Sequence, residues 1–270
     1  MSPPIRIAIH GAAGRMGTGL LALLREDPRF ALVAALVAPG SEREGMPVHA
    51  PALADEPHYA AQLGSMPVDV LVDFTGAAGF ARAVHLCRTR GIALLSGSTG
   101  LGADDWAALD EASKHIAVLH AANFSLGIAV LTRLLRTAAA ALPQWDIEIC
   151  EAHHAHKQDA PSGTALALGA VAAAARGHVP DALMQPARHG HSGARVPGSI
   201  GFAVMRGGDV VGEHSAWLLG AGERIELSHR ASDRAIFARG ALEAAHWLAG
   251  RAPGRYTLEQ VFDADRRSAV

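Results

Sequence analysis

Lysine is scarce in this sequence, and so are cysteine and aromatic residues. Of the 24 basic residues only two are lysines, Lys114 and Lys157, and the other 22 are arginines. The two cysteines, Cys87 and Cys150, are too few for a disulfide framework and suit a reducing compartment. The formal charge of −2 leaves no basic excess of the kind that nucleic-acid-binding proteins carry.

Long apolar segments are missing as well. No run approaches the roughly 20 residues that a membrane-spanning helix requires. The first residues show no basic segment followed by an apolar one, as a signal peptide would. Half of the 270 residues are hydrophobic, which excludes a disordered tail protein and suffices for a full core. We therefore expect a soluble, cytoplasmic protein with two domains or one large one, and with neither nucleic-acid nor membrane partners.

A strand, a glycine-rich turn and a helix follow one another near the start. Residues 5–9 predict a buried strand, Gly11-Ala-Ala-Gly-Arg-Met-Gly17 follows, and residues 20–24 are helical. This order is typical of dinucleotide binding, because Gly11 allows a tight turn and Gly14 lets the backbone approach a pyrophosphate at a helix N-terminus. The spacing is G-x-x-G-x-x-G, a variant of the commoner G-x-G-x-x-G, and 29 glycines also produce such spacings by chance.

Strands and helices then alternate as far as residue 124. Strands are expected at 30–37, 68–75, 92–95 and 116–119, and helices at 77–89 and 104–114. The pattern predicts an α/β, Rossmann-like domain with a doubly wound parallel sheet, whose ligands bind outside the carboxyl ends of the strands. Ser98, Thr99 and Asn123 lie in turns at those ends. They could be turn and cap formers, but their shared edge favours cofactor contacts.

The pattern changes near residue 126. A helix is expected at 126–141, strands at 145–153, 199–205, 210–219 and 224–229, and a last helix at 234–248. Alternating polar and apolar residues indicate a sheet with one exposed face, so we expect a second, α+β domain on a mixed or antiparallel sheet. The expected boundaries are 1–125 plus 235–270 for the dinucleotide-binding domain and 126–234 for the second domain.

The stretch Glu151-Ala-His-His-Ala-His-Lys-Gln-Asp-Ala-Pro-Ser-Gly-Thr164 gathers three histidines, a lysine and two acids within its first nine positions. In a chain that otherwise uses arginine, Lys157 suggests a need for an amine, because an ammonium can give up a proton and a guanidinium cannot. His153 and its neighbours can supply or relay a proton near neutral pH. The stretch therefore predicts a site where a substrate gains a proton.

Helix-start signals follow this cluster. Ser162 or Thr164 is the expected N-cap of a helix that runs to Arg176. Backbone N–H groups of Gly163 and Thr164 at this helix start would bind a carboxylate. The predicted substrate is therefore an anion.

Two other interpretations of this region stay open. His154 and His156 could be zinc ligands, but Lys157 would repel the metal and no third ligand pair lies nearby, so we predict no metal site. Cys150 could be a thiol nucleophile, as in semialdehyde dehydrogenases. Its place inside an apolar strand favours a buried, inert thiol.

Residues 151–165 closely resemble the signature of the 4-hydroxy-tetrahydrodipicolinate reductase (dihydrodipicolinate reductase) family, enzymes of the diaminopimelate route to lysine. The likeness spans nearly the whole chain. Supporting segments are Gly11-Ala-Ala-Gly-Arg-Met-Gly17, Asp73-Phe-Thr75, Gly97-Ser-Thr-Gly100, Ala121-Ala-Asn-Phe-Ser125, Arg195-Val-Pro-Gly-Ser-Ile-Gly-Phe202 and Gly208-Asp-Val-Val-Gly-Glu-His214.

The resemblance implies an oxidoreductase that transfers a hydride from NADH or NADPH to a cyclic dicarboxylate, with loss of water. By analogy His153 is the acid/base residue, Lys157 the proton donor, and His154, Gly163 and Thr164 hold the substrate. Implied cofactor contacts are Gly11, Ala12, Ala13, Gly14, Arg15, Met16, Gly97, Ser98, Thr99, Ala121, Ala122, Asn123 and Phe124. Family members are usually homotetramers assembled through the sheet of the second domain, which would bind substrate and mediate oligomerisation.

Two departures from the family pattern concern the cofactor. Val37 and Ala38 stand where family members often carry an acid after the second strand, and Gly76 stands where an arginine is common. Arg43 could meet a 2′-phosphate or be a solvated loop residue, so the preference between NADH and NADPH stays open. The alternative functions are another two-domain NAD(P)-dependent oxidoreductase acting on a small semialdehyde or sugar, which would need Cys150, and a non-catalytic dinucleotide sensor.

Overall fold

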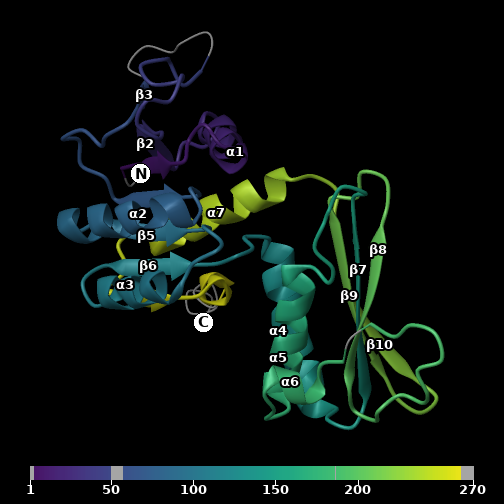
Figure 1. Cartoon of the computed structure of the whole chain (residues 1–270). Helices are drawn as coiled ribbons and strands as arrows, with labels where there is room; N and C mark the ends of the chain where they lie inside the picture. Colours follow the sequence, from purple (N-terminus) through teal and green to yellow (C-terminus); the bar gives the residue numbers. More distant parts are fainter. Residues whose placement is uncertain (1–2, 50–56, 186, 263–270) are drawn as a thin grey trace. The chain divides into compact units, whose positions relative to one another are not determined.

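A seven-stranded sheet and a four-stranded sheet organise the part of the chain that the computed structural model describes, residues 3–49, 57–185 and 187–262 (Figure 1). The chain divides into two compact units: one runs to Phe124 and resumes at Ala235, and the other spans Ser125–Arg234. Within the described ranges, no helix is both long enough and apolar enough to cross a membrane.

The first unit is built on the seven-stranded sheet, whose order is β11-β6-β5-β4-β1-β2-β3. Its strands are β1 (Ile5–His10), β2 (Phe30–Leu36), β3 (Tyr59–Ala60), β4 (Val70–Asp73), β5 (Ala93–Ser96), β6 (Ala117–His120) and β11 (Gly254–Tyr256). Every neighbouring pair is parallel. The chain leaves β1 towards β2 on one side and returns through β4 on the other. The switch point therefore lies between β1 and β4, where ligands of doubly wound sheets bind.

Helices cover both faces of this sheet, which explains why its central strands are apolar throughout. The helices are α1 (Arg15–Leu24), α2 (Ala77–Arg90), α3 (Ala103–Ser113) and α7 (Ala235–Leu248), followed by the 3₁₀ helix η1 (Leu258–Phe262). Phe80 of α2 and Leu109 of α3 pack with Leu71 and Leu94 of the sheet in one buried cluster. Helix α7 contacts α1 and the strands β4, β5 and β6. Burial on both faces removes the polar alternation that a half-exposed strand shows.

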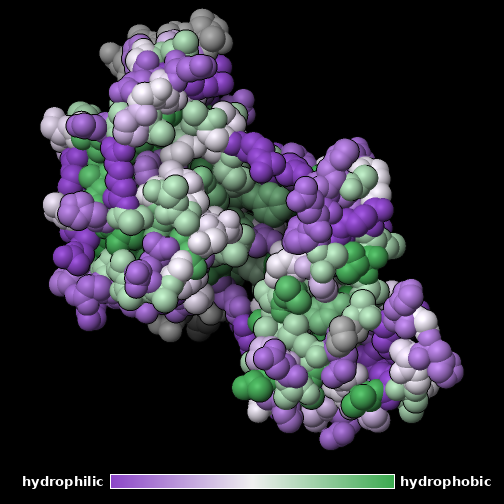
Figure 2. All heavy atoms as spheres, viewed as in Figure 1, coloured by the Kyte–Doolittle hydropathy of each residue, from purple (hydrophilic) through white to green (hydrophobic). Residues whose placement is uncertain are grey.

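The second unit carries helices on one face of a mixed sheet with the order β10-β9-β7-β8. Its elements are α4 (Leu126–Ala141), β7 (Asp146–His153), α5 (Gly163–Ala175), α6 (Pro180–Leu183), β8 (Ile200–Arg206), β9 (Gly212–Leu219) and β10 (Arg224–Ala231). Strand β7 runs parallel to β8 and antiparallel to β9. Ile147 and Ile149 of β7 pack with Leu135 of α4 and Leu168 of α5. Figure 2 shows apolar atoms on the helical layer of this unit, and Val130 of α4 is among its exposed apolar residues.

The predicted fold class, a Rossmann-like parallel sheet plus a second domain on a mixed sheet, is confirmed. Four short elements, β3, α6, β11 and η1, were not predicted, because segments of two to five residues carry no readable periodicity. The strand expected at 68–75 is shorter, Val70–Asp73, since the chain turns at its polar end. The division into units falls beside the expected boundary, while the roles assigned to the two domains stay predictions.

Candidate active site

The glycine-rich turn between β1 and α1 is shaped by steric need. Gly11 has φ +82°, and a Cβ on it would lie 3.0 Å from the carbonyl oxygen of Phe74. A Cβ on Gly14, the N-cap of α1, would lie 3.2 Å from the Gly11 oxygen, and one on Gly17 only 2.3 Å from that atom. Only glycine allows this turn and the first turn of α1 to pack so closely. The helix N-terminus is thereby presented at the sheet edge, as a pyrophosphate site requires.

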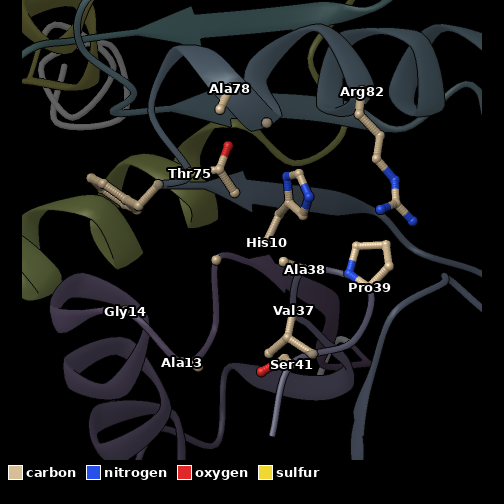
Figure 3. A pocket seen from close by; sticks show the side chains of 13 residues that line it. His10, Ala13, Gly14, Val37, Ala38, Pro39, Ser41, Thr75, Ala78 and Arg82 are labelled. Atoms are coloured by element: carbon tan, nitrogen blue, oxygen red, sulfur yellow. The ribbon is translucent and has the colours of Figure 1, made fainter. Parts of the chain in front are cut away.

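A pocket of about 460 Å³ lies at this edge, between the turn after β1, the loop after β2 and the turn after β4 (Figure 3). It is lined by His10, Gly11, Ala13, Gly14, Val37, Ala38, Pro39, Ser41, Phe74, Thr75, Ala78, Gly79 and Arg82. Gly11, Ala13 and Gly14 are thus the predicted cofactor residues that line it. Among the others of that segment, Ala12 is buried beneath the turn, and Arg15 is exposed on α1. Met16 is half-buried.

The other predicted cofactor residues follow neighbouring strands. Gly97, Ser98 and Thr99 follow β5, and Ala121, Ala122, Asn123 and Phe124 follow β6. A Cβ on Gly97 would lie 2.0 Å from the Phe74 ring, and Phe124 meets that ring edge-on with centroids 5.6 Å apart. These segments share the sheet edge with the pocket but do not belong to its lining.

Asp73, the last residue of β4, contacts side chains from β1, from β5 and from the turns that follow β4 and β5 at this edge. Its buried carboxylate accepts hydrogen bonds from Ser98 Oγ (2.7 Å), Thr75 Oγ1 (2.7 Å) and Ser96 Oγ (2.9 Å), and meets His10 Nδ1 at 3.0 Å. Burial alone would raise the pKa of Asp73, but the bonds from His10, Thr75 and Ser98 hold this pKa below its usual value. The carboxylate therefore stays ionised, and the Ser98 hydroxyl is one of the donors that stabilise it. Sequence reasoning assigned no role to Asp73 or His10, although a lone acid closing an apolar strand was a visible signal.

The loop after β2 brings no acid into the pocket lining, in keeping with Val37 and Ala38 at that point. Glu44 lies further along and accepts a hydrogen bond from the backbone N–H of Gly40 (3.2 Å). The guanidinium of Arg43 lies over the Tyr59 ring, 5.8 Å from its centroid, and outside the lining. Arg82 of α2 does line the pocket and reaches over it towards the β2 loop (Figure 3). The pocket thus has a cation that sequence reasoning missed.

The central histidine cluster forms a second site, in the other unit, at the end of β7. His153 Nδ1 lies 2.5 Å from Glu151 Oε2, and both residues lie on one face of the strand. Glu151 is buried and also accepts two hydrogen bonds from Arg206 of β8, each 2.8 Å, and one from the backbone N–H of Ser162 (3.0 Å). Burial alone would raise the pKa of Glu151, yet the bonds from Arg206, His153 and Ser162 hold this pKa below its usual value.

His214 of β9 completes this polar cluster. It pairs with Glu151 in the strand register, and its ring lies edge-on to the His153 ring with centroids 5.1 Å apart. Its Nε2 lies 3.1 Å from Ser162 Oγ. Burial, followed by the nearby His153, lowers the pKa of His214 to about 4. This imidazole is therefore neutral near pH 7.

Lys157 follows in the loop after β7. Its Nζ lies 2.8 and 3.0 Å from the two carboxylate oxygens of Asp159. Its backbone N–H donates to the His154 carbonyl (3.2 Å), and the His154 and His156 rings lie 6.3 Å apart. Strand β7 ends at His153, as expected, and His154 begins the loop that follows.

Ser162, one of the two expected N-caps, caps α5. Its Oγ accepts the backbone N–H of Ala165 (3.2 Å), and Gly163 is the first residue of the helix. A Cβ on Gly163 would meet nothing within 4 Å, so space is open beside the first turn. The first N–H groups of a helix have no acceptor inside it. Gly163 and Thr164 are the first two residues of α5, at the helix end whose dipole favours negative charge.

Cys150 differs from the expectation of full burial. It lies half-buried on the open face of β7, because a sheet covered by helices on one side leaves alternate residues towards solvent. Burial, then the nearby Glu148 and Glu226, raise the pKa of its thiol, so little thiolate forms at neutral pH. Among the described residues, no group of three or more His, Cys, Asp or Glu is placed to hold a metal ion.

Comparison with known proteins shows the family to which the chain belongs. A family model described as "Dihydrodipicolinate reductase, N-terminus" matches residues 5–124, and its counterpart "Dihydrodipicolinate reductase, C-terminus" matches residues 127–262. The chain belongs to the dihydrodipicolinate reductase family. The resemblance seen in the sequence is confirmed.

Relatives within this family are similar over almost their whole length. The 4-hydroxy-tetrahydrodipicolinate reductase of Xanthomonas campestris pv. campestris (strain B100) is 45% identical over 260 residues, which cover 96% of this chain and 98% of the relative. The enzyme of the same name from Alkalilimnicola ehrlichii is 46% identical over 263 residues, covering 95% and 98%.

Solved structures agree on the fold. The dipicolinate-bound dihydrodipicolinate reductase from Paenisporosarcina sp. TG-14 matches with a TM-score of 0.77 and 23% identity, covering 95% of this chain and 99% of that one. The amine dehydrogenase from Mycobacterium smegmatis matches with a TM-score of 0.64 at 11% identity, covering 94% and 95%. At such identities the likeness shows the shared two-domain fold.

Proposed function

We propose that this chain reduces 4-hydroxy-tetrahydrodipicolinate to tetrahydrodipicolinate with NADH or NADPH, with loss of water, in lysine and diaminopimelate biosynthesis. Family membership over both halves of the chain supports this reaction. One structural observation carries it: a histidine, a lysine and an open helix N-terminus stand together in residues 153–164. Such a set suits a dicarboxylate that accepts a proton.

The substrate is held, in this proposal, by the first turn of α5 and by His154. The N–H groups of Gly163 and Thr164 take one carboxylate, because they stand at the positive end of a helix. His153 acts as the acid/base residue through Nε2, since Nδ1 is engaged by Glu151. Lys157 donates a proton where negative charge develops, and must first leave Asp159. A substrate carboxylate can replace Asp159 as the partner of the ammonium.

The residues of the first unit fit a nicotinamide dinucleotide, which supplies the hydride when bound. The glycines leave no room for Cβ atoms beside the α1 N-terminus, and the pocket of about 460 Å³ opens there. We assign Gly11 to Met16 to the pyrophosphate turn and residues 97–99 and 121–124 to the remaining contacts along the edge. Arg82 is placed to meet a 2′-phosphate, since an arginine near the ribose is what accommodates NADP in such folds.

A mechanism through Cys150, as a semialdehyde substrate would need, is disfavoured by the raised pKa of this thiol. We also propose that the protein is a cytoplasmic homotetramer assembled through the open face of its second sheet. Cys150 pairs with Ala203 across β7 and β8, and Met205, two residues further on the same face, is 62% exposed. Light scattering after gel filtration measures the assembly, and Met205→Asp should dissociate it.

An assay of cofactor oxidation tests the proposed reaction. NADH and NADPH oxidation are followed side by side with freshly generated 4-hydroxy-tetrahydrodipicolinate, and no oxidation with either cofactor would end the reductase assignment. Lys157→Ala should lower kcat by about 100-fold or more while cofactor affinity stays unchanged. Lys157→Arg keeps the charge but not the transferable proton, so it should also be slow.

The chain offers a matched control, because its other lysine lies outside the site. Lys114 directly follows α3, and its ammonium pairs with Glu111 at 2.5 Å on the surface. Lys114→Ala should keep the kcat of the unaltered enzyme. Intact kcat in Lys157→Ala would remove the proton-donor role from this lysine.

A further inference from the structure

Glu151 uses its two carboxylate oxygens on two different parts of the site. Oε2 lies 2.5 Å from His153 Nδ1, and Oε1 accepts the backbone N–H of Ser162 at 3.0 Å. One contact reaches the imidazole that moves the proton. The other reaches the N-cap of α5, the helix that would bind the substrate carboxylate. The carboxylate therefore contacts both the histidine that would transfer the proton and the helix that would bind the substrate.

Arg206 keeps the carboxylate of Glu151 ionised. Its Nη1 and Nη2 donate one hydrogen bond to each oxygen of Glu151, both at 2.8 Å. The strand register makes this pairing fixed, because Arg206 lies opposite His153 across β7 and β8. Arg206 Nη2 also donates to the carbonyl of Asp159 (2.6 Å), which anchors the loop that carries Lys157. A buried carboxylate requires such a partner to remain charged.

An ionised carboxylate only accepts hydrogen bonds, so it assigns the proton of neutral His153 to Nδ1. Nε2 is then the atom free to exchange a proton with substrate. A side chain at position 212 would crowd this atom, because a Cβ on Gly212 would lie 3.1 Å from Nε2. The other groups around this imidazole are His214 on β9, whose pKa is lowered to about 4, Arg206 on β8, and His154 and Lys157 in the loop. Glu151 is the carboxylate in contact with the ring.

We propose that Glu151 is the positioning residue of this site, setting the tautomer of His153 and holding its imidazole in register with the first turn of α5. This inference rests on the proposed reductase function, in which His153 is the acid/base residue. Glu151 itself need not touch the substrate. It acts by fixing which nitrogen faces the substrate and how far that nitrogen lies from the bound carboxylate.

Glu151→Gln tests the tautomer. With its amide oxygen on the Ser162 N–H and on Arg206 Nη2, the glutamine turns its NH₂ group towards His153 Nδ1. Arg206 Nη1 loses its acceptor there, and the imidazole proton moves to Nε2. In a Ser-His-Asp site the corresponding Asp-to-Asn change leaves the geometry intact and lowers kcat about 10⁴-fold. We expect kcat to fall by about 100-fold or more with a much smaller change in KM, since the α5 contact survives. A kcat within threefold of the unaltered enzyme, in folded protein, would overturn the proposal.

A second measurement does not depend on turnover. ¹⁵N-histidine NMR of the substrate-free protein, with His153→Gln to identify the signal, should show Nδ1–H in the unaltered chain and Nε2–H in Glu151→Gln. The same tautomer in both would contradict the inference whatever the substrate is. Failure of the unaltered enzyme to oxidise cofactor would instead count against the reductase function, so the two failures are distinguishable.

Two matched variants control for folding. Glu243→Gln makes the same change in a carboxylate paired with Arg29 (2.6 Å) in the other unit, and should leave kcat and the His153 signal unchanged. Ser162→Ala removes the side-chain cap and the His214 contact but keeps the N–H that donates to Glu151. It should keep the Nδ1–H tautomer. If Ser162→Ala loses that tautomer, the contact between Ser162 and His214 sets it, and Glu151 does not.

Discussion

Removing Arg206 should leave the buried carboxylate of Glu151 without its guanidinium partner. The resulting loss in free energy of unfolding should depend on pH. Arg206→Met keeps a long apolar stem but deletes both 2.8 Å hydrogen bonds to Glu151 and the one to Asp159. Breaking a buried ion pair from one side costs about 3–5 kcal/mol. Because 19% of the arginine side chain is exposed and Glu151 is fully covered, we take about 3 kcal/mol, the lower end of that range.

The sign of the pH dependence follows from Glu151. In the unaltered protein its folded pKa is lowered, so its contribution to stability is present above the unfolded value near 4.5 and is lost as pH falls through the folded value. In Arg206→Met the largest opposing hydrogen bonds are gone, and burial raises this pKa above the unfolded one. The free energy of unfolding of the variant then declines as pH rises. Its difference from the unaltered protein should therefore grow between pH 4.5 and pH 7.5.

Thermal unfolding followed by circular dichroism measures this difference. A loss of about 3 kcal/mol corresponds to a midpoint lowered on the order of 10 °C. Arg176→Met is the matched control. Its guanidinium donates to the carbonyl oxygens of Gly198 (2.9 Å), Leu142 (3.1 Å) and Trp145 (2.6 Å) and, among the described residues, to no carboxylate, so the loss of unfolding free energy in this variant should vary much less with pH. A deficit for Arg206→Met that is equally flat, or below about 1 kcal/mol, would refute the reasoning.

Further expectations concern the cofactor site and the thiol. Arg82→Ala should raise KM for NADPH about tenfold and KM for NADH much less, because one charge-assisted hydrogen bond contributes about 1.5–3 kcal/mol; equal changes for both cofactors would remove Arg82 from a 2′-phosphate site. Gly17→Ala places a Cβ 2.3 Å from the Gly11 carbonyl oxygen, so the melting midpoint should fall and NADPH should bind more weakly in a fluorescence titration. An unchanged midpoint would show that the turn can relax. Cys150→Ser should keep kcat within twofold in the reductase assay, and its inactivity would restore the thiol mechanism.

The local features of the site were readable from the sequence. The alternation of β7 put Glu151 and His153 on one face, and the Pro-Ser-Gly-Thr segment predicted the start of α5, where Ser162 is the cap. Both depend on neighbours within a few residues, so short-range geometry decides them. The role of Glu151 was not foreseen, because a glutamate two residues before a histidine has many uses on a strand.

Long-range partners could not be foreseen in the same way. Arg206 and His214 reach Glu151 only because β8 and β9 pair with β7 in one particular register. A slip of one residue in that pairing would turn both side chains to the other face. Likewise Arg82 enters the pocket only because α2 lines the side of it that lies across from the turn after β1. Arg43, nearer the expected ribose contact in sequence, lies against Tyr59 instead.

The sequence by itself determined the family, the doubly wound sheet, the glycine turn and the histidine-rich stretch at 151–164, because each is written in residues close together along the chain. Only the tertiary structure decided which groups keep Glu151 charged, which nitrogen of His153 faces away from Glu151, and which arginine lines the pocket beside the glycine turn. Those outcomes depend on strand register and helix packing, which bring together residues that lie dozens of positions apart.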